Sequence, residues 1–330
     1  MNSSVISKPI LPVAGVHRSS ADDRSTGRPA TGSRQNDDGP LNPPGRGLSE
    51  NSARSEALLR CRKPFITATF NANTAREEVR ASEIAHCFES CGIKILGIQE
   101  HRRVHEDPVV FSRLEGQYLI TASAWRNQSQ ASVGGVGLLL STRARKALRR
   151  ATRHSDRILV AEFDSNPVTT VIVTYSPTNT SPEEVVENYY DDLSDVIRGV
   201  PAHNFLAVLG DFNARLGTED ASFTWHDKTN RNGELLAEIM TEHSLLPANT
   251  QFRKKQGKRW TYLDRGTGMK RQLDYILVRR KWWNSILNAE PYNTFCTVGS
   301  DHRVVSMRVR LSLRVPKQNS EQSLTGINSL

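Results

Sequence analysis

The sequence has no long hydrophobic run and no recognisable export signal. No stretch of roughly 18 or more apolar residues occurs in its 330 residues, so we expect no membrane-spanning helix and no membrane partner. The first ten residues, MNSSVISKPI, lack a basic segment followed by an apolar core, which argues against a secretory signal peptide. These absences predict a nuclear or cytoplasmic protein that is not secreted.

Cysteine is also scarce, with only Cys61, Cys87, Cys91 and Cys296 in the whole chain. A disulfide-stabilised scaffold needs many more per residue. Cys87 and Cys91 lie four residues apart in an expected helix and would suit a metal, but no second Cys or His pair follows at zinc spacing. Reduced thiols in an intracellular protein are the favoured interpretation.

Aromatic residues make up 7% of the chain and are nearly absent from residues 1–62, which are rich in Ser, Gly, Pro, Asn and Arg. Such a segment cannot bury enough apolar surface to offset the entropy of ordering it. We therefore predict a disordered polar tail over 1–62, one domain over 63–314 and a second disordered tail over 315–330.

The net charge of +9 is unevenly distributed. Between Arg253 and Lys317 there are sixteen Lys and Arg against four Asp and Glu. A basic face suits a polyanion such as nucleic acid, although a solvated surface that only aids solubility is equally consistent.

Alternating and continuous apolar runs predict an α/β domain. Apparent hairpins at 116–141 and 157–179 favour mixed or antiparallel sheets over a purely parallel one. The expected strands lie within residues 64–74, 93–99, 116–125, 134–141, 157–165, 168–179, 204–213, 259–266, 271–280 and 302–313.

Two of the expected helices carry capping-box signatures, Thr74 with Glu77 and Ser181 with Glu184, and Pro182 fits the first helical position of the second. Their expected buried stripes are Val79, Ile84, Phe88 and Cys91 in the first helix and Val185, Tyr189, Leu193 and Ile197 in the second.

Six of the expected strands run into polar residues that no strand requires. Any one of them is ordinarily a turn or a helix cap, but if the sheets pack face to face these strand ends converge on one rim. The residues concerned are Asn71, Glu100, Tyr175, Asp211, Asn213, Asp274, Asp301 and His302.

A rim that holds Glu100, Asp211, Asp274 and Asp301 would be strongly acidic, and carboxylates so close repel unless a cation lies among them. Oxygen ligands without Cys favour a hard ion, Mg²⁺ or Mn²⁺. A basic surface around an acidic metal site is the layout expected for cutting nucleic acid.

The stretch AVLGDFNARLG places Asp211 and Asn213 two residues apart after an apolar run. In extended backbone both side chains would leave the same face of the strand, so one could serve a water and the other a phosphate. The alternative is an Asx-turn that merely ends the strand.

Six motifs, in order, resemble the endonuclease/exonuclease/phosphatase superfamily, over about residues 63–314. They are TFNANT, GIQEHR, TYSPTN, LGDFNARLG, RQLDYILV and GSDHRVV. The chain looks most like the non-LTR retrotransposon endonucleases, especially the craniofacial-development-protein-2-like sequences derived from them. The resemblance implies a four-layer α/β sandwich, in which two mixed, mainly antiparallel β-sheets pack face to face and are flanked by helices, as in deoxyribonuclease.

The resemblance also implies roles for the polar residues. Asp211 would orient and deprotonate the attacking water, Asn213 would contact the phosphate, and Tyr175 would lie beside it. His302, protonated, would donate to a phosphate oxygen, and Asp274 would orient His302 from behind.

The implied metal ligands are Glu100 and Asp301, with Asn71 helping to hold them. On the substrate side, Thr261 matches a supporting hydroxyl, and Arg259 and Lys258 belong to the basic loop RKKQGKR. That loop suits a DNA contact or a nuclear import signal equally well.

The sequence departs from many apurinic endonucleases at Asn73, where they have Asp, which removes one charged outer ligand. His86, His101, His154, His203 and His243 have no motif support and are expected on the surface or in loops. Trp282 and Trp283 would stack on bases or, more often for such a position, pack on the core.

The function implied is a Mg²⁺-dependent endonuclease, with Mn²⁺ as an alternative ion, that acts as a monomer and nicks DNA to leave a 3′ hydroxyl. A non-catalytic module that binds nucleic acid or protein, and a phosphatase of the same fold, stay open as alternatives.

Overall fold

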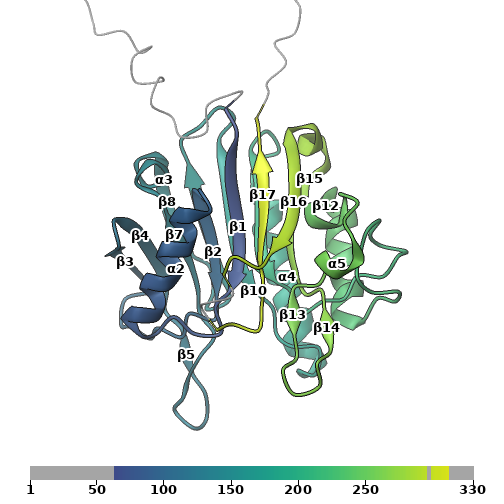
Figure 1. Ribbon diagram of the computed structural model, residues 1–330, viewed down its shortest axis with the longest axis horizontal. Coiled ribbons are helices and arrows are strands. Elements are labelled where there is room, and N and C mark those ends of the chain that lie inside the picture. Colours follow the sequence, from purple (N-terminus) through teal and green to yellow (C-terminus); the bar gives the residue numbers. More distant parts are fainter. Residues whose placement is uncertain (1–62, 296–298, 312–330) are drawn as a thin grey trace, which may run out of the picture. The chain divides into compact units, whose positions relative to one another are not determined.

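Two β-sheets lie face to face at the centre of the protein (Figure 1). The computed structural model describes residues 63–295 and 299–311, which all fall within one compact unit. The tails expected over 1–62 and 315–330 lie outside the described residues.

The first sheet has seven strands in the order β16-β17-β1-β2-β7-β4-β3. Within it β1 and β2 are parallel, and every other neighbouring pair is antiparallel. Its strands are β1 (Phe65–Asn71), β2 (Ile95–Gln99), β3 (Val109–Leu114), β4 (Gln117–Ala122), β7 (Val136–Leu140), β16 (Ile286–Tyr292) and β17 (Val304–Val309).

The second sheet has six strands in the order β12-β15-β11-β10-β9-β8, with one parallel pair, β10 and β11. The predicted sandwich of two mixed, mainly antiparallel sheets is thus confirmed, as are the hairpins β4–β7 and β9–β10. Its strands are β8 (Leu148–Arg153), β9 (Ile158–Phe163), β10 (Thr169–Tyr175), β11 (Phe205–Asp211), β12 (Leu245–Pro247) and β15 (Asp274–Arg279).

Short two-stranded ribbons extend from the ends of the sheets. Strands β5 (Trp125–Arg126) and β6 (Ser132–Val133) form one, and β13 (Tyr262–Leu263) and β14 (Lys270–Arg271) form the other. Both project from the same end of the sandwich, at the bottom of Figure 1.

Apolar side chains fill the space between the sheets. Leu138 and Ile95 from the first sheet and Val173 and Leu209 from the second are fully buried there. Trp282 and Trp283, in the 3-10 helix η4 (Arg280–Ser285), pack against this core, and the Trp282 indole N–H donates to the Asn204 carbonyl. The tryptophans are therefore core residues, as their position after a strand favoured.

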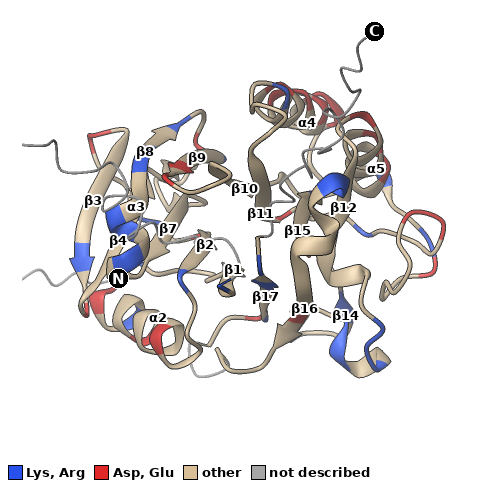
Figure 2. Cartoon of the chain, turned by 90° about the horizontal axis from the view of Figure 1, so that it is seen from above, with Lys and Arg blue, Asp and Glu red and all other residues tan. Residues whose placement is uncertain are grey.

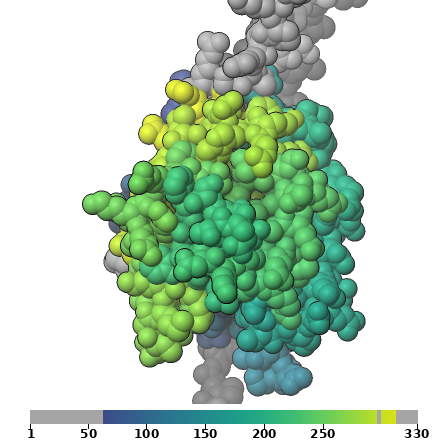
Figure 3. Space-filling view, turned by 90° about the vertical axis from the view of Figure 1, so that its right-hand side faces the viewer, coloured from purple at the N-terminus to yellow at the C-terminus, as the bar shows by residue number. Residues whose placement is uncertain are grey.

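Helices cover the outer faces. Helix α2 (Glu78–Ser90) packs on the first sheet, and α4 (Glu183–Arg198) and α5 (Arg231–Glu242) pack on the second, while α3 (Thr142–Ala147) connects β7 to β8. The face in Figure 3 is built mainly from green and yellow-green residues, the second half of the described chain. No helix among the described residues is long and apolar enough to cross a membrane.

The helix starts differ from the predicted capping boxes. Helix α2 begins at Glu78, beyond Thr74, and α4 has Pro182 as its N-cap, with no side-chain cap in either case. The buried stripes shift accordingly. Val79 is 74% exposed because it lies five residues, or about 140°, from buried Ile84. Val185 is also exposed, since the stripe that meets the sheet starts at Val186.

Acidic and basic residues are concentrated on different elements of the surface. Asp and Glu gather on α4 and α5, whereas β14 carries Lys and Arg (Figure 2). Helix α4 alone has six acidic side chains and one basic one, Arg198. A polyanion is therefore not expected on the α4 face.

Gly97 in β2 allows the two sheets to approach closely, and we expect Gly97→Val to destabilise the fold. A Cβ at this position would lie 3.1 Å from Leu209 Cβ and 3.2 Å from Val173 Cγ1. Overpacking of this kind costs about 1–3 kcal/mol of unfolding free energy, which urea denaturation would measure. Gly257→Val, where the space is open, is the control. Equal unfolding free energies for Gly97→Val and Gly257→Val would contradict the close approach of the two sheets at Gly97.

Candidate active site

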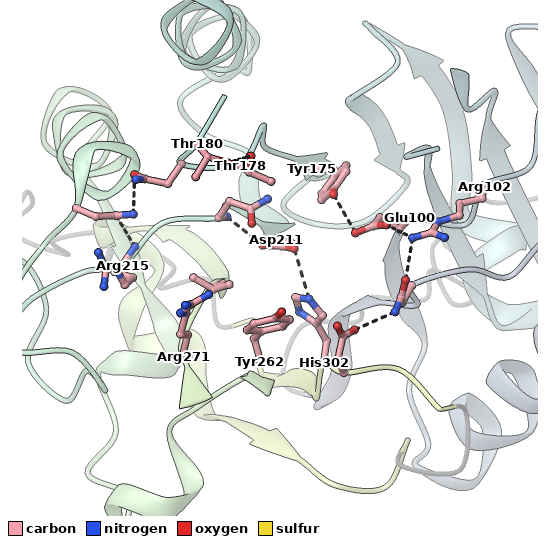
Figure 4. A pocket seen from close by; sticks show the side chains of 16 residues that line it. Glu100, Arg102, Tyr175, Thr178, Thr180, Asp211, Arg215, Tyr262, Arg271 and His302 are labelled. Atoms are coloured by element: carbon pink, nitrogen blue, oxygen red, sulfur yellow. Dashed lines mark hydrogen bonds and ion pairs between the residues drawn. The ribbon is translucent and has the colours of Figure 1, made fainter. Parts of the chain in front are cut away.

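The polar strand ends converge as the sequence predicts. A pocket of about 490 Å³ opens between the ends of the two sheets, and Glu100, Tyr175, Asp211, Asn213, Asp301 and His302 all line it (Figure 4). Strand register creates this arrangement, because Tyr175, Asp211 and Asp274 stand side by side at the ends of β10, β11 and β15.

Asp211 and Asp274 face each other across antiparallel strands, 2% and 0% exposed, and His302 lies against both. His302 Nδ1 is 2.9 Å from Asp274 Oδ2, and its Nε2 is 3.8 Å from Asp211 Oδ2. Burial opposes a charged imidazole, but the carboxylates of Asp274, Asp211 and Asp301 outweigh it and raise the pKa of His302. Asp274 therefore lies behind His302 as expected, and the imidazole is held as a cation.

Asn71 at the end of β1 links the two sheets. Its Nδ2 donates to Asp211 Oδ2 at 2.9 Å and to Glu100 Oε1 at 3.0 Å, while its Oδ1 accepts the backbone N–H of Asn73. In this arrangement Asn71 orients two carboxylates and its oxygen faces the backbone. Its predicted help in holding the metal ligands is thus indirect.

Glu100 follows β2 and accepts three side-chain hydrogen bonds. The Tyr175 hydroxyl and Asn71 donate to Oε1, and Arg102 Nη2 donates to Oε2 at 2.7 Å. Burial opposes ionisation of Glu100, but these bonds, led by that of Arg102, lower its pKa. Burial and then Glu100 itself raise the pKa of Tyr175, so its phenol stays protonated.

Asp301 reaches the pocket from the loop before β17. Its Oδ1 accepts a hydrogen bond from Asn73 Nδ2 at 3.2 Å, and its backbone carbonyl accepts one from Leu263. The Ser300 hydroxyl bonds the Asn71 carbonyl and so ties this loop to the end of β1.

The geometry around Asn213 corrects the expectation of a continuous strand. Strand β11 ends at Asp211, and Asn213 has a left-handed backbone with φ of 47°. Asp211 Oδ1 accepts the Asn213 backbone N–H at 3.0 Å, which is the Asx-turn that was the alternative. Asn213 Nδ2 also donates to the Ser176 carbonyl, so the turn itself directs both side chains to the pocket.

The three residues expected on the substrate side lie elsewhere. Thr261 is fully buried, and its hydroxyl accepts the backbone N–H groups of Leu273 and Asp274, so it supports the site from behind. Arg259 donates to two backbone carbonyls of its own neighbourhood, and neither it nor Lys258 is among the pocket-lining residues. Sequence pattern alone did not show which way this basic loop turns.

Three arginines that the sequence reasoning missed line the pocket instead: Arg102, Arg215 and Arg271. The Arg271 guanidinium lies 5.9 Å over the Tyr262 ring, which packs 4.9 Å from the His302 ring. Each of the three arginines lies two or three residues from a motif carboxylate or amide, namely Glu100, Asn213 and Asp274. This short spacing is the feature of the sequence from which their place in the pocket could have been predicted.

His101 lies in the loop after β2, one of the two places expected for it, but its side chain is buried and not on the surface. Its Nε2 bonds the carbonyls of Ala122 and Val136, and its Nδ1 accepts the backbone N–H of Arg103. These partners hold a neutral ring, and burial lowers its pKa to about 4. His101 thus fixes the chain directly after Glu100.

The donor set fits a hard divalent ion. Among the described residues, the group with metal-ligand atoms within 4.8 Å of one another is Asp211, Asp274 and His302. In that group the His302 cation offsets one of the two carboxylate charges, so Glu100 and Asp301, which also line the pocket, are better placed to hold a divalent ion. The buried cysteine of α2, Cys87, and the half-buried Cys91 belong to no such group.

Comparison with known sequences agrees with this geometry. The sequence profile of the Endonuclease/Exonuclease/phosphatase family matches residues 68–302. The chain belongs to this family. Among curated members, it is 26% identical over 269 residues to craniofacial development protein 2 of Bos taurus and 25% identical over 273 residues to that of Tragulus javanicus. Those matches take in 79% and 80% of this chain but 43% and 46% of theirs, so the chain spans less than half the length of these relatives.

Solved structures share the family fold. The 3′-5′ exonuclease NExo of Neisseria meningitidis has a TM-score of 0.57 at 18% identity, with 74% of this chain and 98% of that chain covered. The AP endonuclease LMAP of Leishmania major has 0.60 at 14%, covering 79% and 95%. The endonuclease domain of the telomere-specific non-LTR retrotransposon TRAS1 has 0.53 at 16%, covering 75% and 99%. The predicted resemblance to this family, and to craniofacial development protein 2 within it, is confirmed.

The neutral state of His101 predicts an acid-sensitive fold. The pKa of about 4 lies below the ordinary 6.5, so the stabilisation is present above pH 6.5 and is lost as the pH falls towards 4. The loss approaches about 3 kcal/mol, and His101→Gln should remove this part of the pH dependence. Urea unfolding between pH 7 and 4.5, in EDTA, measures it.

The exposed His86 provides the control, because His86→Gln should leave the wild-type profile unchanged. A His101→Gln profile as steep as that of the wild type would disprove the buried neutral state.

Proposed function

We propose that the chain is a metal-dependent phosphodiester hydrolase that nicks DNA and leaves a 3′ hydroxyl and a 5′ phosphate. The observation that supports this is the pocket in which Asp211, His302, Asn213 and the open carboxylates Glu100 and Asp301 meet. The pocket joins a buried base, a fixed cation and a place for a divalent ion, which together suit a phosphodiester better than any uncharged substrate.

Asp211 is the general base of this proposal. Burial and then Asp274 raise its pKa, which brings the carboxylate nearer to the range of an effective base at neutral pH. Asn71 holds Oδ2 and the Asn213 backbone N–H holds Oδ1, so the carboxylate is oriented before the water arrives. It would receive the proton of the water that attacks phosphorus in line.

His302 and Asn213 serve the phosphate. The His302 ring donates from Nδ1 to Asp274, and its Nε2, 3.8 Å from Asp211 Oδ2, would offer the second N–H to a non-bridging oxygen of the phosphate. Asn213 uses one N–H on Ser176 and has another for the phosphate. Tyr175, kept protonated beside Glu100, can donate to the same group or to the leaving oxygen.

Glu100 and Asp301 would hold the metal, with Asn71 orienting Glu100. A bound Mg²⁺, or Mn²⁺ in its place, neutralises charge that develops on the phosphate and the leaving oxygen. The ion would also lower the repulsion between the phosphodiester and these two carboxylates, of which Glu100 is already paired with Arg102.

Long DNA is the favoured substrate because cations lie at several places along the pocket. Arg102, Arg215 and Arg271 line it, and the basic β13–β14 ribbon projects beside it. A structural neighbour is described as a 3′ phosphatase from Neisseria bound to a product DNA hairpin. We propose a monomer that acts on DNA in the nucleus or cytoplasm, with a retrotransposon endonuclease as its ancestor.

Plasmid nicking tests the proposal. The wild type with Mg²⁺ should convert supercoiled plasmid to open circles, whereas EDTA or Asp211→Asn should slow this by roughly 10²-fold or more, because the oriented base or the cation is lost. Asp192→Asn, on the exposed face of α4, is the matched control. If the wild type nicks no faster than Asp211→Asn, the protein is a binding module instead.

The released ends decide between the endonuclease and the phosphatase. An endonuclease of this kind leaves ends that a polymerase extends without further treatment. Release of inorganic phosphate from a 3′-phosphorylated oligonucleotide, with no nicked circles, would favour the phosphatase.

Asp274→Asn tests the positioning of His302. Loss of the carboxylate should reduce kcat by roughly 10²-fold and leave KM nearly unchanged, because Asp274 touches His302 and not the substrate. Steady-state nicking of a short duplex measures the two constants, with exposed Asp227→Asn as the control. A change confined to KM would assign Asp274 to substrate binding.

A further inference from the structure

Arg102 lines the pocket but has no part in the proposed chemistry. Its Nη2 donates to Glu100 Oε2 at 2.7 Å and to Asn73 Oδ1 at 2.8 Å, and Asn73 Nδ2 donates to Asp301 Oδ1 at 3.2 Å. Arg102 and Asn73 therefore bridge the two carboxylates that would hold the metal (Figure 4).

The backbone fixes Arg102 in this position. Asn73, Glu100 and Arg102 have φ of 49°, 53° and 56°, in the left-handed region that non-glycine residues rarely adopt. The Arg102 backbone N–H donates to the Gly134 carbonyl, and the Ser132 hydroxyl donates to the Arg102 carbonyl. The β5–β6 ribbon thus holds this residue at the rim of the pocket against a conformational cost.

The guanidinium is not fully satisfied where it lies. Arg102 Nε is buried and has no hydrogen-bond partner in the described structure. A buried donor without a partner is destabilising, so an arrangement that gives it an anionic oxygen would be preferred. A phosphodiester entering the pocket carries such oxygens.

A divalent ion and this guanidinium compete for one atom. Glu100 Oε1 already accepts two hydrogen bonds, from Asn71 and Tyr175, which leaves Oε2 as the freer oxygen for an ion. Arg102 occupies Oε2, and two cations on the same carboxylate oxygen repel. An ion that binds here is therefore favoured by displacement of Arg102 from Glu100.

We propose that Arg102 is a latch on the metal site, which neutralises Glu100 in the ion-free protein and moves to the phosphodiester when ion and substrate bind together. This rests on the proposed function, because it takes Glu100 as a metal ligand and a phosphodiester as substrate. The ion releases Arg102 from Glu100, and the phosphodiester gives the released guanidinium an anionic partner. Ion and DNA therefore bind cooperatively, and each raises the affinity for the other by the same factor.

Mn²⁺ binding to the full chain, followed by electron paramagnetic resonance without DNA, tests the latch. Arg102→Gln keeps a hydrogen-bond donor but removes the charge, so it should bind Mn²⁺ roughly tenfold or more tightly than the wild type. Arg102→Lys keeps the charge and should stay close to the wild type.

Arg103→Gln is the matched control. Arg103 donates to the Ala75 carbonyl and to Glu78 outside the pocket, so its loss should leave Mn²⁺ affinity unchanged. Glu100→Gln should weaken binding in both the wild-type and Arg102→Gln backgrounds, which places the ion at this carboxylate. Urea midpoints would confirm that each variant is folded.

A second titration, with a phosphorothioate duplex that resists cleavage, tests the coupling. The duplex should tighten Mn²⁺ binding to the wild type by several-fold more than to Arg102→Gln, because the variant has no latch to release. Equal tightening in both, or Mn²⁺ affinity in Arg102→Gln no greater than in the wild type, would overturn the latch.

This result is separable from that of the nicking assay. Coupled Mn²⁺ and duplex binding without nicked circles would support the latch and reject the endonuclease. Nicked circles without coupling between Mn²⁺ and duplex binding would support the endonuclease and reject the latch.

Discussion

The site depends on one electrostatic constraint, the repulsion between Asp211 and Asp274. These residues are direct partners across the buried ends of β11 and β15, where like charges destabilise a sheet. Neither is exposed enough for water to screen the charge. The compensation comes from His302 on the loop before β17 and from Asn71 at the end of β1, both belonging to the other sheet. The two sheets are thus joined at this end by charge as well as by apolar packing.

The same constraint divides the carboxylates into two kinds. Asp211 and Asp274 are compensated inside the protein, and their geometry is therefore fixed before any ligand arrives. Glu100 and Asp301 face the pocket, where the Arg102–Asn73 bridge joins them and Arg102 is the cation bonded to Glu100. In the latch proposed above, an entering ion displaces this bridge, whereas the contact between His302 and Asp274 stays in place. In the proposed hydrolysis of a phosphodiester, Asp211 would be the preorganised base and the bound divalent ion the exchangeable cation.

The fold and the membership of the site were largely predictable from the sequence. Polar residues after apolar strands, such as Tyr175 and Asp211, carry a local signal, and packing the sheets face to face brings them together. Details that depend on tertiary contacts were not predictable. The direction of Arg259 is set by the carbonyls of Lys254 in its own loop and of Thr224 in a distant segment. The ring of His101 is held in the interior by the carbonyls of Ala122 and Val136 on neighbouring strands. Helical periodicity likewise could not decide between Val185 and Val186 as the first buried residue of α4. The choice depends on which face of the helix packs against the second sheet.

The distribution of charge over the rest of the surface bears on how the proposed nucleic-acid substrate would approach. The outer helices α4 and α5 are acidic and would repel a phosphate backbone, whereas the pocket end carries Arg102, Arg215 and Arg271 and the basic β14. In the proposed function, a strand of nucleic acid would approach the open ends of the two sheets, between the β5–β6 and β13–β14 ribbons, where these basic residues lie. That path passes over Glu100 and Asp301, so a phosphate backbone meets the carboxylates at the one place where a displaceable guanidinium lies between them. In this proposal Arg102 would both attract the phosphate backbone and neutralise Glu100 until the ion binds.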